Sequence, residues 1–186
     1  MFCRQKTLLL TLALVTILSM CPGDCRGDAP CCCPTFWTAY NGSCYRLFSY
    51  SMNWHEAEAH CNQFSRPSLG GGDRNSVAHL VSIHSPDEHD FVVSYFRSTG
   101  IKDLGADESI GRVGDMWIGI HDTTSEGNFE WTDRSSFTMN MWYPGQPDNS
   151  GSGEDCGEIR NVIGFKWNDR PCDNVNKYFM CKLPVW

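Results

Sequence analysis

Residues 53–64 (NWHEAEAHCNQF) carry apolar side chains at the spacing of one helix face. These apolar positions are Trp54, Ala57, Cys61 and Phe64. Asn53 is the expected N-cap, and Glu56, three residues later, can complete a capping box. The pattern predicts a helix that directs Cys61 into the core.

A second helix is predicted from residue 85 onward (SPDEHDFVVSYF). Ser85 and Glu88 have the spacing of a capping box, and Pro86 occupies the first helical position, where its missing N–H costs nothing. Between the two helices, the glycine-rich segment 66–76 (RPSLGGGDRNS) predicts a mobile surface loop.

Short aromatic and β-branched runs follow the second helix and predict strands. They are MWIGI at 116–120, NFEWTD at 128–133, GFKWND at 164–169 and KYFMCKL at 177–183. Two helices followed by strands indicate an α+β domain. The region from Asp133 to Cys172 is expected to be mostly loop, and a loop of that length indicates a functional region or a mistaken assignment. The aromatic residues of the first two runs are expected in the core.

The start of the chain has the pattern of a signal peptide. Arg4 and Lys6 precede an apolar run of roughly 14 residues, which is shorter than the roughly 20 that a membrane span needs. We expect cleavage after residues 1–23, or as late as Gly27, with a short membrane anchor as the alternative. No other segment of the sequence could span a bilayer, and the product is expected to be secreted and extracellular.

The length of 186 residues favours a single domain. We expect a short Cys-rich leader at 24–32 and one globular domain at 33–186. The formal charge is −7, with no Lys/Arg cluster, which argues against nucleic acid or an anionic membrane as a partner. Removing residues 1–23 would make the charge more negative still, a balance compatible with a bound divalent cation.

Eleven cysteines in a secreted chain predict a disulfide framework rather than thiolate metal sites. Cys3 and Cys21 would leave with the signal peptide. The segment 146–156 (QPDNSGSGEDC) sets side-chain oxygens around a Gly/Ser tract with no obvious positive partner. The groups in question are the amide of Gln146 and the carboxylates of Asp148, Glu154 and Asp155. These groups would repel one another, so a cation is expected there.

With the two helices, WIGI, the QPD and GEDC motifs, WND and the cysteine order in view, residues 33–186 resemble a C-type lectin-like domain. The resemblance implies two helices with short antiparallel sheets and a long calcium-binding loop region. The segment CCCPTFWTAYNGSCYRLF is also similar to the start of single-domain secreted invertebrate lectins.

The resemblance implies three disulfide bonds: Cys61 with Cys181, Cys156 with Cys172, and Cys33 with Cys44. Cys31 and Cys32 remain, together with Cys25 if cleavage falls at Gly23. They indicate interchain disulfides and a disulfide-linked homo-oligomer. A bridge between the adjacent cysteines or a small-thiol cap are the alternatives.

By the same resemblance, one Ca²⁺ site would be formed by Gln146, Asp148, Glu154, Asn168 and Asp169, with a cis peptide before Pro147. Two vicinal sugar hydroxyls would contact the ion and hydrogen-bond to these same side chains. In the family, QPD goes with galactose rather than mannose. The tryptophan that usually follows QPD in galactose binders is absent, and Trp142 is expected in the core.

A second, weaker Ca²⁺ site is implied at Asp122, Glu126, Asn149, Glu154 and Asp155, where Asn149 replaces the usual aspartate. The leading function is therefore a multivalent lectin for galactose-type glycans with a humoral defence role. The rival function is an extracellular or biomineral matrix protein, or another protein-binding member of the family, that does not recognise sugar.

Enzyme chemistry finds no support in the sequence. His55 and His60 of HEAEAH are five residues apart, so they lie about 140° apart around a helix and cannot hold one metal ion together. The NGS sequon makes Asn41 a candidate glycosylation site. The RGD at Arg26–Asp28 is interpreted as coincidental.

Overall fold

The computed structural model describes residues 33–66, 76–100, 114–151, 153–173 and 175–184. It contains helices α1 (Trp54–Cys61) and α2 (Pro86–Ser98), and a 3₁₀ turn at Asn161–Ile163. The strands are β1 (Thr38–Tyr40), β2 (Ser43–Met52), β3 (Ser65–Arg66), β4 (Ser76–Val77), β5 (His79–Leu80), β6 (Met116–His121), β7 (Glu130–Trp131), β8 (Cys156–Arg160), β9 (Lys166–Arg170) and β10 (Lys177–Pro184). The predicted α+β class is confirmed.

The main sheet has eight strands. Six of them follow the order β1-β2-β10-β6-β8-β9, with β5 added on β10 and β7 on β6. The pair β10–β6 is parallel and the other strand pairs are antiparallel, so the expected antiparallel pairing is found throughout the sheet except between β10 and β6. Strands β3 and β4 form a separate pair. The final strand therefore lies inside the sheet, next to the first long strand.

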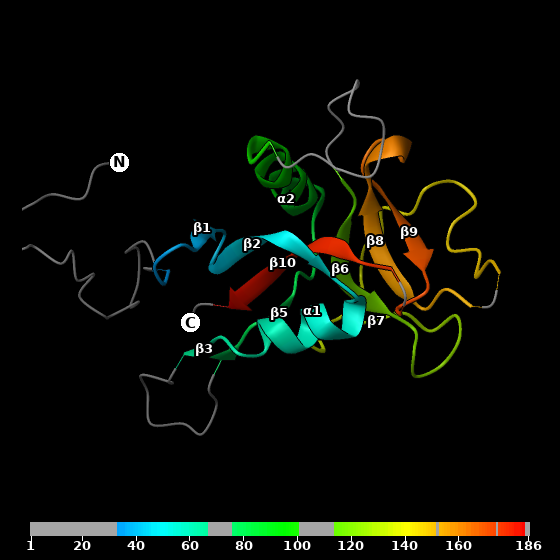
Figure 1. Ribbon diagram of the computed structural model, residues 1–186, viewed down its shortest axis with the longest axis horizontal. Coiled ribbons are helices and arrows are strands. Elements are labelled where there is room, and N and C mark those ends of the chain that lie inside the picture. The colour runs from blue at the N-terminus through cyan, green and yellow to red at the C-terminus, as the bar shows by residue number, and fades with distance from the viewer. Residues whose placement is uncertain (1–32, 67–75, 101–113, 152, 174, 185–186) are drawn as a thin grey trace, which may run out of the picture.

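Each helix covers one face of the sheet, giving three layers (Figure 1). On the α1 side, Trp54 packs in a cluster with Trp117 and Phe179. On the α2 side, Val92 and Phe96 pack in a second cluster with Met116, Ile118 and Met180. Neighbouring residues of β6 and β10 enter different clusters because successive strand side chains point to opposite faces.

Helix α1 begins as predicted. The Asn53 side chain accepts a hydrogen bond from the Glu56 N–H at 2.9 Å, and the Glu56 carboxylate accepts from the Asn53 N–H at 3.3 Å. Trp54, Ala57 and Cys61 are buried. Cys61 is bonded to Cys181 of β10, which fixes the helix to the sheet.

Helix α2 also begins at the predicted residue, with the Ser85 hydroxyl accepting from the Glu88 N–H at 3.1 Å. The second hydrogen bond of the predicted capping box, from the Ser85 N–H to the Glu88 carboxylate, does not form. The Glu88 carboxylate turns into the protein, where the Tyr45 hydroxyl and the Lys182 ammonium both donate to it at 2.6 Å. Glu88 thus ties α2 to β2 and β10.

Six strands were not predicted from the sequence pattern: β1, β2, β3, β4, β5 and β8. The run NFEWTD forms only the two-residue β7, whereas GFKWND and KYFMCKL are confirmed within β9 and β10. Because β8 and β9 cover much of residues 156–170, the expected long loop is correct only up to Asp155. In the predicted surface loop, residues 67–75 lie outside the described residues.

The structure also shows where other residues named in the sequence analysis lie. His55 is exposed, and His60 forms a hydrogen bond with the Tyr50 hydroxyl at 2.9 Å. Trp117 and Trp131 are buried, as expected. Asn41 is exposed in the turn between β1 and β2. The signal peptide, Cys25, Cys31, Cys32 and the RGD lie outside the described residues. In the described part of the chain, none of the helices has the length and apolarity that crossing a membrane requires.

Replacement of Glu88 is expected to destabilise the protein in a pH-dependent way. Burial acts to raise the pKa of Glu88, but Lys182 and the hydrogen bonds from Tyr45 and the His84 N–H outweigh it, so the net shift is downward. A lowered pKa contributes stability above the unfolded value of about 4.3, and that stability is lost as the pH falls. Glu88→Gln should reduce the thermal midpoint at neutral pH, and the difference from wild type should shrink below about pH 4.

Thermal unfolding followed by circular dichroism from neutral to acidic pH measures this effect. Asp90→Asn, at an exposed carboxylate of the same helix, is the control and should change the midpoint little. A Glu88→Gln deficit of constant size across the whole pH range would contradict the assigned ion pair.

Candidate functional site

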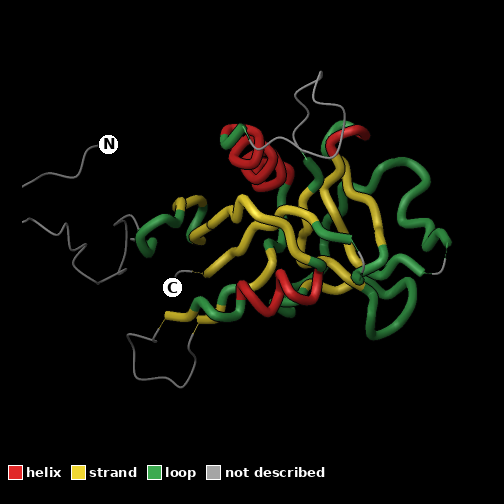
Figure 2. Tube along the Cα trace, in the orientation of Figure 1, coloured by secondary structure: helices red, strands yellow, loops and turns green. Residues whose placement is uncertain are grey.

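A long loop at residues 132–155, between β7 and β8, is fastened to the edge strand β9 (Figure 2). The Trp167 N–H donates to the Met141 carbonyl, and the Tyr143 N–H donates to the Trp167 carbonyl, both at 2.9 Å. Trp142, partly buried against the core, packs edge-to-face on Trp167 with ring centroids 5.8 Å apart. These contacts place the QPD segment beside Asn168 and Asp169.

The far end of the loop is held by a disulfide bond. Cys156 at the start of β8 is bonded to Cys172, just beyond β9. Strands β8 and β9 pair directly, with Gly157 opposite Asp169 and Glu158 opposite Asn168. All three disulfides implied by the resemblance are present, the others being Cys33–Cys44 and Cys61–Cys181.

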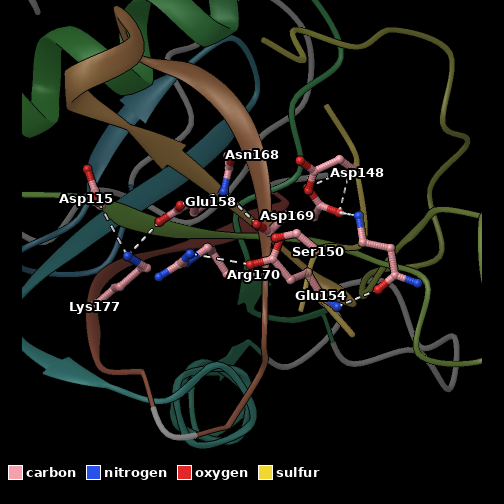
Figure 3. Close-up of polar contacts among 10 residues, drawn as sticks. Asp115, Asp148, Ser150, Glu154, Glu158, Asn168, Asp169, Arg170 and Lys177 are labelled. Atoms are coloured by element: carbon pink, nitrogen blue, oxygen red, sulfur yellow. Dashed lines mark hydrogen bonds and ion pairs between the residues drawn. The ribbon is translucent and has the colours of Figure 1, made fainter. Parts of the chain in front are cut away.

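Three acidic residues of the first predicted set converge (Figure 3). Asp148, Glu154 and Asp169 each offer a carboxylate oxygen, and these oxygens lie within 4.8 Å of one another. Asp148 is exposed, whereas Glu154 is 5% exposed and Asp169 is fully buried. Charges of one sign this close repel strongly where water is excluded.

The loop backbone supports this convergence. The Asp169 carboxylate accepts hydrogen bonds from the N–H groups of Asp148, at 3.1 Å, and Asn149, at 2.8 Å. The Gln146–Pro147 peptide is cis, as expected. The Gln146 side-chain oxygen is buried and has no hydrogen-bond partner among the described residues.

These residues fit a hard divalent cation. Three carboxylates and the amide of Gln146 present only oxygen ligands, which Ca²⁺ prefers, and Asn168 adds a second amide in β9. In the part of the chain that the structure describes, the basic side chain paired with this cluster is Arg170, whose Nη1 lies 3.4 Å from Glu154 Oε1. Arg170 is 37% exposed, so its compensation is weak.

Sequence reasoning missed three residues at this site. Ser150 donates from its hydroxyl to Glu154 Oε2 at 2.8 Å, and Arg170 contacts the other oxygen of the same carboxylate. Glu158, fully buried, accepts from the Asn168 side-chain amide at 3.0 Å. Arg170 follows WND directly and Ser150 lies four residues before Glu154, so the proximity of both was readable from the sequence. The role of Glu158 depends on the pairing of β8 with β9.

The second predicted set is only partly assembled. Asp122 is 2% exposed, and its Oδ2 accepts from the Gly127 N–H at 2.7 Å, while its buried Oδ1 has no partner among the described residues. The Asp122 N–H donates to the Asp155 carbonyl at 3.1 Å. Asn149 Oδ1 accepts from the Glu154 N–H at 2.7 Å. Among the described residues, the acidic members of this second set do not bring three carboxylate oxygens within 4.8 Å of one another, as those of the first set do.

The pKa values of two members of the second set, Asp122 and Glu126, nevertheless indicate accumulated negative charge. Burial raises the pKa of Asp122, and the neighbouring Asp155 and Asp169 carboxylates raise it further. Loss of hydration followed by the charges of Asp122 and Asp155 raises the pKa of Glu126 as well. A cation near Asp122 would relieve this repulsion.

Comparison with known proteins identifies the family. The model of the Lectin C-type domain matches residues 50–183. The chain belongs to the C-type lectin family. Echinoidin from Heliocidaris crassispina is 47% identical over 155 residues, which cover 83% of this chain and 99% of echinoidin.

Other relatives agree. The alpha-N-acetylgalactosamine-specific lectin of Patiria pectinifera is 36% identical over 172 residues, covering 91% of each chain. The crystal structure of the C-type lectin CEL-I from Cucumaria echinata matches with a TM-score of 0.69 and 36% identity, covering 83% of this chain and 99% of CEL-I. These relatives are lectins, which bind carbohydrate without catalysis, and this C-type lectin is not an enzyme.

Proposed function

We propose that this C-type lectin binds galactose-type glycans in a calcium-dependent manner at Gln146, Asp148, Glu154, Asn168 and Asp169. The observation that carries the proposal is the convergence of three carboxylates, supported by a buried Gln146 side-chain oxygen that has no hydrogen-bond partner among the described residues. An oxygen-only set with excess negative charge is stabilised by a cation and is costly without one.

Calcium, when bound, supplies a positive centre for two vicinal hydroxyls of the sugar. The protein side chains set the direction of the hydrogen bonds around those hydroxyls. The Gln146 amide can donate to a sugar oxygen, and the Asp148 carboxylate can only accept from a hydroxyl. This donor and acceptor order is the basis for expecting galactose over mannose.

The names of the relatives support carbohydrate binding but do not select one sugar. One relative is named for alpha-N-acetylgalactosamine, and a lectin from Notechis scutatus scutatus, 33% identical, is named a mannose-binding isoform. The galactose assignment therefore rests on the order of hydrogen-bond donor and acceptor side chains in the QPD motif.

Tyr143 supplies an aromatic ring near the motif, where the usual tryptophan is absent. Its side chain is 42% exposed, and its carbonyl accepts from the Gln146 N–H at 2.8 Å. The Tyr143 backbone is thus held to Gln146, and its exposed ring can pack against the apolar face of a sugar while its hydroxyl stays in water. Tyr143 thus favours galactose binding despite the missing tryptophan.

We extend the proposal to the setting of the protein. The signal-peptide pattern at 1–23 supports secretion, and the exposed Asn41 supports glycosylation. Cys31 and Cys32 are proposed to link several chains, so that individually weak sites gain avidity on multivalent glycans. Agglutination in humoral defence is the corresponding role. A second Ca²⁺ at Asp122, Glu126, Asn149, Glu154 and Asp155 is proposed to order the same loop.

Calcium is expected to raise the thermal midpoint of the protein. Only the folded chain gathers these carboxylates, so a concentration 100-fold above the dissociation constant stabilises by about 2.7 kcal/mol. Differential scanning calorimetry with calcium or with chelator measures the shift. Asp148→Ala, at an exposed ligand, should reduce the shift, whereas Asp87→Ala on the exposed start of α2 should retain it. Equal shifts in both variants would place the ion elsewhere.

Retention on sugar-coupled resins tests the recognition. We expect the secreted protein to be retained on galactose in calcium, to elute with chelator, and to bind mannose and fucose less well. Asp148→Ala should abolish retention while the circular dichroism spectrum is unchanged. Retention only on mannose or fucose would overturn the galactose assignment. Calcium-dependent binding to mineral or protein that no monosaccharide displaces would favour the matrix function instead.

A further inference from the structure

A buried carboxylate lies directly behind the proposed site (Figure 3). Glu158 of β8 is fully buried, and its Oε2 lies 2.6 Å from the Lys177 ammonium of β10. Lys177 in turn lies 3.4 Å from Asp115 Oδ2. The other oxygen of Glu158, Oε1, accepts from the Asn168 side-chain nitrogen at 3.0 Å. A charged chain of three residues therefore ends on an expected Ca²⁺ ligand.

The contacts of Asn168 permit one orientation of its amide. Its Nδ2 donates to Glu158 Oε1 and to the Asp169 carbonyl. Oε1 acts as an acceptor because the other oxygen of the carboxylate, Oε2, is the one that contacts the Lys177 ammonium, and a carbonyl can only accept. Turning the amide over would set its oxygen against these two acceptors. Asn168 is 4% exposed, so water can replace neither contact easily. Its Oδ1 therefore points away from Glu158.

The ion pair with Lys177 keeps Glu158 as the hydrogen-bond acceptor of the Asn168 amide. With Oε2 engaged by Lys177, the Glu158 side chain cannot rotate its charge toward the cation and compete as a ligand. A buried ion pair contributes little net stability compared with apolar side chains of similar volume, because both charges lose their hydration. Stability alone therefore does not account for a paired charge at this position.

We propose that Glu158, held by Lys177, is a positioning residue that fixes the Asn168 amide with Oδ1 directed toward the cation and the sugar. This inference rests on the proposed function for the role of Asn168 as a ligand. Glu158 and Asn168 are direct cross-strand partners in β8 and β9, and side chains of such partners lie on the same face of the sheet. The positioning contact thus follows from the strand register.

Two double variants separate positioning from stability. Glu158→Gln with Lys177→Met removes the ion pair but keeps a carbonyl acceptor for Asn168. Glu158→Met with Lys177→Met removes the ion pair and the acceptor together. Both variants replace the two charges as a unit, which avoids leaving one of them buried alone.

Isothermal titration with calcium compares the variants. We expect the Gln-containing variant to bind calcium close to the wild-type affinity. The Met-containing variant should bind roughly 10–100-fold more weakly, the usual effect of removing a residue that orients a metal ligand. Calcium-free thermal midpoints of the two variants should be similar. Equal calcium affinities in the two variants would overturn the inference.

Nuclear magnetic resonance of the calcium-free wild-type protein gives an independent readout that requires no double variant to fold. The Asn168 side-chain amide, assigned with Asn168→Asp, should show two resolved protons protected from exchange with water. A freely exchanging amide would refute the fixed orientation. If wild-type protein binds no calcium while this amide is protected, the proposed function falls and the positioning contact of Glu158 stands.

Discussion

The proposed site of this lectin depends on holding three carboxylates together, two of them where water cannot screen them. Asp169 is fully buried and Glu154 is 5% exposed, yet both lie within 4.8 Å of the Asp148 carboxylate oxygen. Repulsion of this kind favours any rearrangement that lets the groups separate into solvent. The surrounding structure must therefore be rigid enough to prevent that separation when the cation is absent.

Rigidity comes from covalent and aromatic anchors rather than from a core inside the loop. The Cys156–Cys172 bond fixes one end, and the edge-to-face stack of Trp131, Trp167 and Trp142 fixes the middle. Gly157 lets β8 approach β6 closely, since a Cβ there would lie 2.1 Å from an Ile120 methyl carbon. These anchors hold the loop independently of a cation, which would reduce the ordering cost of the proposed Ca²⁺ binding.

Local sequence rules located both helices because their caps and apolar faces lie within a few residues. The same rules failed for the Glu88 side chain, whose partner Lys182 is 94 residues away. Strand β8 (CGEIR) was missed because its Glu158 points inward, where a periodic pattern would expect an apolar residue. The proposed Ca²⁺ ligands were predicted through motif resemblance. Their supporting residues were not, since strand register and disulfide closure determine which side chains meet.

The final strand connects these observations. Lys177 and Lys182, near the two ends of β10, pair with Glu158 and Glu88, which are nearly inaccessible to water. Until β10 joins the sheet, each of these carboxylates would have to be buried without its lysine, or stay in water and leave α2 and β8 unpacked. Burying an unpaired charge is strongly unfavourable. Insertion of β10 is therefore coupled to the packing of α2 and to the placement of Asn168, so the sugar-binding face should form only with the complete sheet.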